Sequence, residues 1–263
     1  MKKVRVDLLL VERGLAESRA QAQRLVMAGQ VRVDGQIVAK PSSTMPIEAQ
    51  LTVDLGPDFV SRGGDKLKAA LQAFNLDISG LVCADVGAST GGFTDCLLQS
   101  GAKRVYAIDV GKGILHWKLR QDPRVIVMEA TNARYLGQMP EPVQFVTMDV
   151  SFISSKLLLP VVKNWFPAAG GQLVLLIKPQ FEAGKAETAR GGGVIRDANI
   201  HRRVLNDVLG FAQDSDLSAQ GLIRSPLLGP KGNVEFFAFF YYSIGVHKDL
   251  SELIESCVPQ RVS

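Results

Sequence analysis

Charged side chains close four apolar segments of the chain, and they are the first candidates for chemistry. Short runs of mainly apolar residues end at Asp85, Asp109, Asp149 and Lys178. Such runs predict strands of a parallel sheet, in which ligands bind beyond the carboxyl ends. We therefore expect the four charges to point toward one crevice. A lysine that closes a fully apolar strand emerges at solvent, pairs with an acid or lies in the site, and Asp149 is the obvious partner of Lys178.

A glycine-rich turn follows the first of these strands and is typical of a cofactor-binding turn. Gly87, Gly91 and Gly92 let the backbone bend sharply and a ligand approach, and the helix predicted from residue 93 offers free N–H groups. The spacing differs from the G-x-G-x-x-G of dinucleotide-binding proteins. Because the carboxylate of Asp85 disfavours a pyrophosphate but tolerates an amino group and a sulfonium, the turn favours S-adenosylmethionine. An ordinary α/β connection is the alternative for the turn alone.

Asp109 strengthens this interpretation. It ends a second apolar run about twenty residues after the turn, where nucleotide-binding α/β proteins place a carboxylate on the ribose hydroxyls. A solvated loop acid is the competing interpretation. Strand, glycine turn, helix, strand and acid together predict a nucleotide-type cofactor site.

Size and composition exclude several classes of protein. With 263 residues and 46% hydrophobic residues, the chain can form a full α/β domain with a small additional module. Its apolar runs are shorter than the ~18 residues that span a bilayer, and the N-terminus does not resemble a secretory signal. Three cysteines without C-x-x-C spacing and three scattered histidines predict neither a disulfide framework nor a metal site. We expect a cytoplasmic protein.

The positive charge is concentrated at the N-terminus. Residues 1–40 have eight basic and four acidic side chains, which accounts for the whole net charge of +4. Two short helices are predicted over residues 6–15 and 18–28, the second capped by Ser18 and Gln21, followed by a hairpin over residues 31–38 and a strand at 50–53. A basic module on an otherwise neutral chain suggests an anionic partner. The basic side chains on its exposed face are Arg5, Arg19, Arg24 and Arg32.

The segment S-R-A-Q-A-Q-R-L-V-M-A-G-Q-V-R-V-D-G resembles the S-four RNA-binding module over about fifty residues. In that family the basic helix face contacts the phosphates of structured RNA. Without the resemblance, a solvated helix face is the simpler interpretation of these arginines.

Further motifs resemble the TlyA family of ribosomal RNA 2′-O-methyltransferases, whose catalytic domain is FtsJ-like. They are S-R-G-G-D-K-L, D-V-G-A-S-T-G-G-F-T-D-C-L-L, T-N-A-R-Y-L, D-V-S-F-I-S, I-K-P-Q-F-E-A-G and G-N-V-E-F, in this order. The resemblance implies a Rossmann-like methyltransferase sheet, mostly parallel with an antiparallel last strand, joined to a small N-terminal α+β module. We predict an RNA-binding module at residues 1–60, a methyltransferase domain at 61–245 and a C-terminal tail at 246–263.

The resemblance also implies the site residues. Matching motifs place a catalytic Lys-Asp-Lys-Glu tetrad on Lys66, Asp149, Lys178 and Glu235, and Arg62 joins the residues expected to bind RNA. Either Lys178 is a neutral general base, or it stays charged and stabilises the developing alkoxide. The residues expected to bind S-adenosylmethionine are Asp85, Gly87, Ala88, Ser89, Gly91, Gly92, Phe93, Asp109, Val110, Glu129, Asn132 and Asp149.

The leading hypothesis is thus a ribosomal RNA 2′-O-methyltransferase that acts on ribosomal RNA or ribosomal subunits, with cytidine as the implied target. An inactive ribosome assembly factor is one alternative. A membrane-active haemolysin is another, because relatives often bear that name, but the sequence lacks a long amphipathic helix with a basic face. The glycine-rich residues 182–196 are interpreted as a loop over the substrate or as an ordinary connector.

Overall fold

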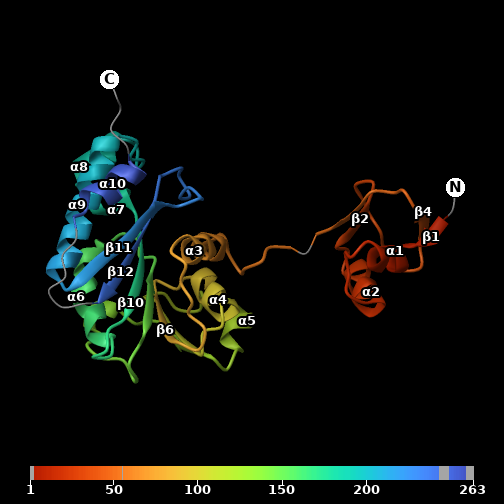
Figure 1. Ribbon diagram of the computed structural model, residues 1–263, viewed down its shortest axis with the longest axis horizontal. Coiled ribbons are helices and arrows are strands. Elements are labelled where there is room, and N and C mark those ends of the chain that lie inside the picture. Colours follow the sequence, from red (N-terminus) through yellow and green to blue (C-terminus); the bar gives the residue numbers. More distant parts are fainter. Residues whose placement is uncertain (1–2, 55, 243–248, 259–263) are drawn as a thin grey trace. The chain divides into compact units, whose positions relative to one another are not determined.

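The computed structural model describes residues 3–54, 56–242 and 249–258, and the chain forms two compact units (Figure 1). The first unit comprises residues 1–58 and the second residues 59–263. Each unit has buried apolar residues of its own, so each is described by itself.

The first unit packs two helices against short antiparallel strands. Strand β1 pairs with β4, and β2 lies between β3 and β5. The predicted hairpin forms around Asp34 and Gly35, whose φ angles of 48° and 82° suit a tight two-residue turn. The elements are β1 Lys3–Arg5, α1 Val6–Glu12, α2 Arg19–Met27, β2 Val31–Val33, β3 Gln36–Ile37, β4 Thr44–Pro46 and β5 Leu51–Val53.

The predicted cap of α2 is present with one difference. The Ser18 hydroxyl accepts a hydrogen bond from the Gln21 N–H at 3.2 Å, as expected. The Gln21 side chain, however, accepts from the N–H of Glu17 at 2.7 Å, one residue before the position that a capping box requires. These two hydrogen bonds fix residues 17 and 18 to the first turn of α2.

Asp7 organises the basic face of this unit, which the sequence did not indicate. Its carboxylate is fully buried and accepts from Arg5 at 2.8 Å, Arg19 at 3.1 Å and Gln23 at 3.1 Å. The hydrogen bond from Arg5 holds the pKa of Asp7 well below its usual range. Arg5 and Arg19 are therefore fixed in ion pairs; Arg5 is partly exposed, whereas Arg19 and Arg24 are exposed.

The second unit is built on a seven-stranded sheet with the order β11-β12-β10-β9-β6-β7-β8. The strands from β10 to β8 are parallel, and β12 is antiparallel to both β10 and β11. The predicted mostly parallel sheet with an antiparallel last strand is confirmed. Its strands are β6 Val82–Val86, β7 Arg104–Ile108, β8 Val125–Met128, β9 Phe145–Met148, β10 Gln172–Ile177, β11 Leu217–Arg224 and β12 Phe236–Tyr242.

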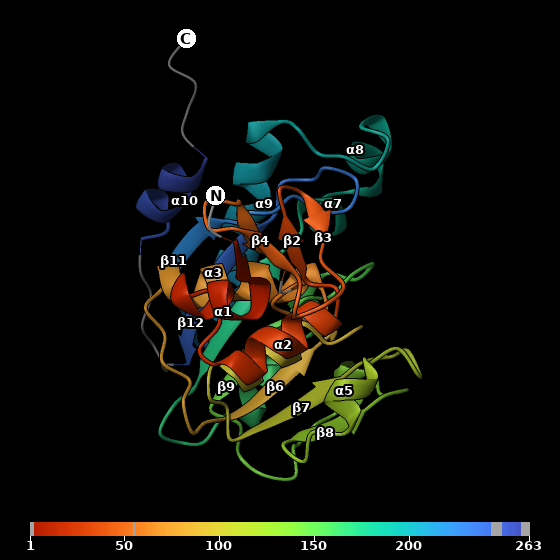
Figure 2. The same ribbon diagram turned by 90° about the vertical axis from the view of Figure 1, so that its right-hand side faces the viewer.

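Helices cover both faces of this sheet, because alternate strand residues point to opposite sides. Cys83 and Val105 join the core under α3 Arg62–Ala73, α4 Gly92–Gln99 and α5 Trp117–Arg120. Ala84 and Tyr106 join the core under α6 Leu159–Val162, α9 Ala198–Asp214 and α10 Ser251–Cys257. Figure 2 shows α5 beside β7 and β8 at one edge of the sheet.

Short helical turns complete the unit. Two of them, α7 Pro179–Glu182 and α8 Lys185–Arg190, follow β10. The segment predicted as a loop at 182–196 is thus partly helical, because residues with good helix propensity lie between its glycines. Helix α10 lies in the predicted tail, of which residues 246–248 and 259–263 are outside the described residues. The three-residue turns are η1 Ala133–Tyr135, η2 Ser155–Leu157 and η3 Lys163–Trp165.

Candidate active site

The glycine turn after β6 is packed closely on two sides. Gly87 has a φ of 85°, and a Cβ on it would lie 2.5 Å from the backbone oxygen of Asp149. A Cβ on Gly92, at the start of α4, would lie 2.2 Å from the hydroxyl oxygen of Ser61. The turn is therefore held between the end of β9 and the segment that begins α3, which brings three predicted motifs together.

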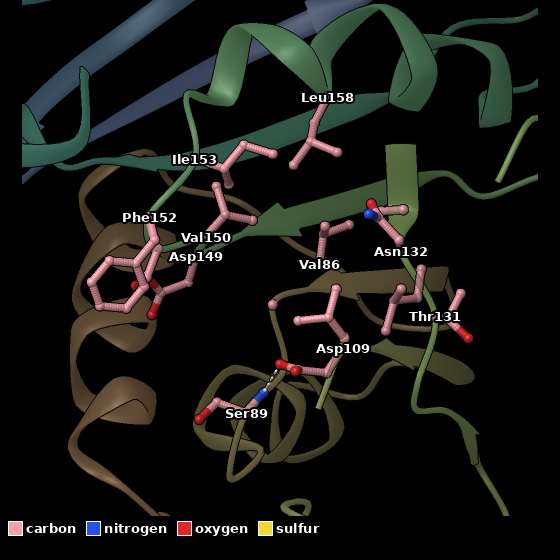
Figure 3. A pocket seen from close by; sticks show the side chains of 15 residues that line it. Val86, Ser89, Asp109, Thr131, Asn132, Asp149, Val150, Phe152, Ile153 and Leu158 are labelled. Atoms are coloured by element: carbon pink, nitrogen blue, oxygen red, sulfur yellow. Dashed lines mark hydrogen bonds between the residues drawn. The ribbon is translucent and has the colours of Figure 1, made fainter. Parts of the chain in front are cut away.

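A first cavity of about 500 Å³ opens beyond the carboxyl ends of β6, β7 and β9. Figure 3 shows the Asp109 carboxylate at its wall, where it accepts from the backbone N–H of Ser89 at 2.8 Å. Asp109 also accepts from the N–H of Gly111 at 2.7 Å, so its position is fixed. The predicted cofactor residues that line this cavity are Gly87, Ser89, Asp109, Val110, Asn132 and Asp149.

A second cavity of about 220 Å³ lies on the other side of the turn. It shares Gly87, Ser89 and Asp149 with the first cavity, so the two spaces adjoin at these residues. Its other predicted site residues are Arg62, Lys66, Ala88, Gly92 and Phe93, whereas Gly91 lines neither cavity.

The four residues of the expected tetrad form two ion pairs near this junction. Lys178 Nζ lies 2.5 Å from Asp149 Oδ1, and Lys66 Nζ lies 2.6 Å from Glu235 Oε2. All four are largely withdrawn from solvent, from Glu235 with a 1% exposed side chain to Asp149 with 25%. Lys178 also donates to the hydroxyl of Ser151 at 2.9 Å. Asp149 lines both cavities and Lys66 lines the second, and the two ion pairs place Lys178 and Glu235 directly beside them.

Comparison with known families agrees with this geometry. A model described as FtsJ-like methyltransferase matches residues 59–242, and one described as S4 domain matches residues 4–49. The chain belongs to the FtsJ-like methyltransferase family. The matched segment covers the sheet, both cavities and both ion pairs. The second unit is therefore called the FtsJ-like unit, and the first the S-four unit.

Three relatives cover nearly the whole chain. "Putative rRNA methyltransferase YqxC" of Bacillus subtilis is 46% identical over 92% of this chain and 86% of its own. "16S/23S rRNA (cytidine-2′-O)-methyltransferase TlyA" of Mycobacterium tuberculosis is 46% identical over 90% and 89%. A solved structure, "Putative hemolysin from Streptococcus thermophilus", is 44% identical with a TM-score of 0.74 and covers 98% and 95%.

Besides Gly91, two predicted cofactor residues of the FtsJ-like unit, Asp85 and Glu129, lie outside both cavities. The side chain of Asp85 is fully buried on the α4 side of the sheet, where it accepts from Thr94 at 2.7 Å and Thr147 at 3.1 Å. The strand continues to Val86, one residue further than predicted, so residue alternation directs Asp85 to the opposite face from the cavity. Asp85 therefore joins β6 to the start of α4 and to β9, and its side chain lines neither cavity.

Glu129 is the second of these residues. Its carboxylate accepts from the backbone N–H groups of Gly113, Ile114 and Leu115 at 2.9 to 3.2 Å and pairs with Arg120. These contacts, led by the hydrogen bond from Gly113, lower the pKa of Glu129 to about 2. It fixes the loop after β7 at the rim of the first cavity and does not line that cavity.

Burial raises the pKa of Asp85 to about 7, which makes a testable prediction for stability. The unfolded chain loses this proton near pH 4, while the folded protein keeps it to about pH 7. Stability from this group is complete below pH 4 and is lost as the pH rises through 7. We therefore compare the unfolding free energies of the wild type and the Asp85→Asn variant. The difference, wild type minus variant, should fall by on the order of 4 kcal/mol between pH 4 and pH 7. Urea unfolding of both proteins from pH 4 to 8 measures it, and parallel curves would contradict the assignment.

Sequence reasoning missed Phe152, which stands at the mouth of the first cavity (Figure 3). Its side chain is 91% exposed and its φ of 64° is in the left-handed region, which is rare for a bulky residue. The ring contacts Phe181 with centroids 4.9 Å apart. A solvent-exposed aromatic ring at the mouth of a cavity is a candidate contact surface for a ligand. The D-V-S-F-I-S motif was the one sequence signal that included Phe152.

The described residues contain no cluster of three or more His, Cys, Asp or Glu side chains that could hold a metal ion. Within the same residues, no helix has the length and apolar character needed to span a membrane.

Proposed function

We propose that this protein transfers a methyl group from S-adenosylmethionine to the ribose 2′-hydroxyl of a cytidine in ribosomal RNA. The observation that carries the proposal is a pair of adjoining cavities in which Asp149, paired with Lys178, lines both, and Lys66, paired with Glu235, lines the second. One cavity suits the methyl donor and the other the acceptor ribose. The printed name of the Mycobacterium tuberculosis relative, 46% identical, supports the same substrate class.

The first cavity fits the chemistry of S-adenosylmethionine. The fixed carboxylate of Asp109 suits the hydroxyls of a ribose, and the 71% exposed side chain of Val110 offers an apolar surface to a base. When bound, S-adenosylmethionine supplies an electrophilic methyl group on a sulfonium. Asp149 and Gly87 lie at the border with the second cavity, where that methyl group must be presented to its acceptor.

Lys178 is the residue we assign to the acceptor hydroxyl. An ammonium has three N–H donors; Lys178 donates one to the Ser151 hydroxyl, and a second side of the ammonium faces Asp149 Oδ1 as an ion pair at 2.5 Å. We assign the third to the ribose oxygen, which orients the hydroxyl. It stabilises the negative charge that develops as the oxygen takes the methyl group from the sulfonium sulfur and the hydroxyl proton passes to water. This arrangement suits a charged Lys178 better than a neutral base. Lys66 lines the second cavity and is held by Glu235, so it adds a second positive charge there.

RNA is the partner that the basic residues of both units support. In the S-four unit, Asp7 fixes Arg5 and Arg19 at the surface, a geometry suited to phosphate oxygens. Arg24 is exposed on α2, and Arg32 is partly exposed on β2. In the FtsJ-like unit, Arg62 is exposed and lines the second cavity. A ribosomal RNA substrate implies the cytoplasm as the working compartment.

The proposal is tested by incubating the protein with S-adenosylmethionine labelled in its methyl group and with isolated small and large ribosomal subunits. We expect label in the ribosomal RNA of at least one subunit. If neither the subunits nor their purified RNA accept label, the proposal is wrong.

A catalytically inactive RNA-binding assembly factor is the alternative to exclude. Such a protein would not need an intact methyl donor site, whereas here the glycine turn and all four tetrad residues are present. Calorimetric titration with S-adenosylmethionine separates the two: binding supports the enzyme, and its absence supports the inactive factor.

We predict that Phe152→Ala lowers kcat/KM for RNA by about tenfold to a hundredfold. Stacking of a base on an aromatic side chain is worth roughly 1–3 kcal/mol, and the exposed ring at the cavity mouth suits an unstacked target base. Phe152→Tyr, which retains an aromatic face, is the matched control and should keep most activity. Steady-state kinetics on RNA measure the effect; equal activity of the alanine and tyrosine variants would contradict it.

A further inference from the structure

Helix α7 places consecutive side chains on three different parts of the site. Gln180 Nε2 lies 3.4 Å from Glu235 Oε1, the ring of Phe181 contacts Phe152, and Glu182 reaches the residues after Phe152. Pro179 at the first helical position starts this turn directly after Lys178. The side chains of Gln180, Phe181 and Glu182 therefore each link α7 to a different neighbouring segment.

Glu182 makes the most specific of these contacts. Its Oε2 accepts from the hydroxyl of Ser154 at 2.6 Å, and its Oε1 accepts from the backbone N–H of Ser155 at 2.8 Å. Both oxygens of one carboxylate thus hold the chain two and three residues after Phe152. The other end of the same loop is held by Lys178, which donates to the Ser151 hydroxyl and forms an ion pair with Asp149.

The backbone between these anchors is strained. Phe152 has a φ of 64°, and such a conformation of a bulky residue persists only where the surroundings enforce it. The anchors are the Lys178–Ser151 bond before Phe152, the Phe181 ring beside it and the Glu182 carboxylate after it. Without Glu182, the loop would be free to relax to negative φ and turn the ring away from the cavity mouth.

We propose that Glu182 is a positioning residue for RNA substrate, which holds the Phe152 loop in its strained conformation and thereby presents the ring to the acceptor nucleotide. The inference rests on the proposed function, because it concerns the acceptor of that reaction. Phe152 lies at the mouth of the first cavity, whereas Asp109, which we assign to the cofactor ribose, is held by Ser89 and Gly111 and not by Glu182. We therefore expect loss of Glu182 to affect RNA more than the cofactor.

A double-mutant cycle between Glu182→Gln and Phe152→Gly tests the coupling. Glutamine cannot accept with both oxygens, so Glu182→Gln should lower kcat/KM for RNA about tenfold, and Glu182→Ala more. Glycine at 152 removes both the ring and the strain, so Glu182→Gln should cost less than twofold more in that background. Additive losses in the cycle would overturn the proposal.

Two further measurements separate positioning from a general structural role. The Kd for S-adenosylmethionine, measured by calorimetry, should change less than threefold in Glu182→Gln. Glu187→Gln is the matched control, because Glu187 pairs with Arg203 and lines neither cavity; it should retain wild-type kcat/KM. If the wild type methylates RNA and Glu182→Gln loses cofactor binding as strongly as activity, the positioning role is wrong while the proposed function stands.

Discussion

Lys178→Ala should lower kcat for methyl transfer to RNA by about a thousandfold. The variant loses the positive charge that we assign to the acceptor oxygen, and removal of one such group typically costs 10²–10³ in rate. Folding should survive, because Asp149, left without its partner, retains 25% exposure and can be hydrated. Single-turnover kinetics with saturating S-adenosylmethionine measure the effect on chemistry directly.

Two further variants test whether Lys178 acts through its positive charge or by removing the hydroxyl proton. Lys178→Arg keeps a positive charge but cannot act as a base, so partial activity favours electrostatic stabilisation and none favours a general base. Lys163→Ala removes a lysine that pairs with Asp216 and lines neither cavity, and it should leave kcat unchanged. A Lys178→Ala enzyme within tenfold of wild type would remove Lys178 from the reaction.

Gly87→Ala should destabilise the protein by about 2–4 kcal/mol and weaken S-adenosylmethionine binding at least tenfold. The new Cβ would lie 2.5 Å from the Asp149 backbone oxygen, and the φ of 85° is unfavourable for alanine. Relief requires the turn and the end of β9 to separate, and these two segments border both cavities. Denaturant unfolding and calorimetric titration measure the two effects.

Gly80→Ala is the matched control for the turn. Gly80 has a similar φ of 75°, but a Cβ there meets no atom within 4 Å. The Gly80→Ala variant should lose about 1 kcal/mol of stability, because alanine disfavours this backbone conformation, and it should bind the cofactor with unchanged affinity. Equal losses of affinity in the two variants would show that packing between Gly87 and Asp149 does not matter for the site.

Strand ends were predictable from sequence because hydrophobic runs and the charges that close them are local patterns. This rule placed Asp109, Asp149 and Lys178 at one edge of the sheet, where Asp109 and Asp149 line the first cavity and Lys178 pairs with Asp149. The rule is wrong for the side chain of Asp85, because residue alternation decides which face a strand residue points to. A strand boundary uncertain by one residue reverses that choice.

Contacts between distant segments were not predictable in the same way. Nothing near Glu182 in the sequence indicates that its carboxylate holds residues 154 and 155, because the contact requires β9 and β10 to lie side by side. The burial of Asp7 likewise depends on how α1 and α2 pack. The exposed ring of Phe152 depends on a backbone conformation that residue type alone disfavours.

The most direct test of the central claim is mass spectrometry of nucleosides from ribosomal RNA methylated by the purified protein. If Lys178, Asp149, Lys66 and Glu235 act on a ribose hydroxyl, the product is 2′-O-methylcytidine, and the Lys178→Ala protein forms none. Methylation on a base, or equal 2′-O-methylcytidine from both proteins, would contradict the account.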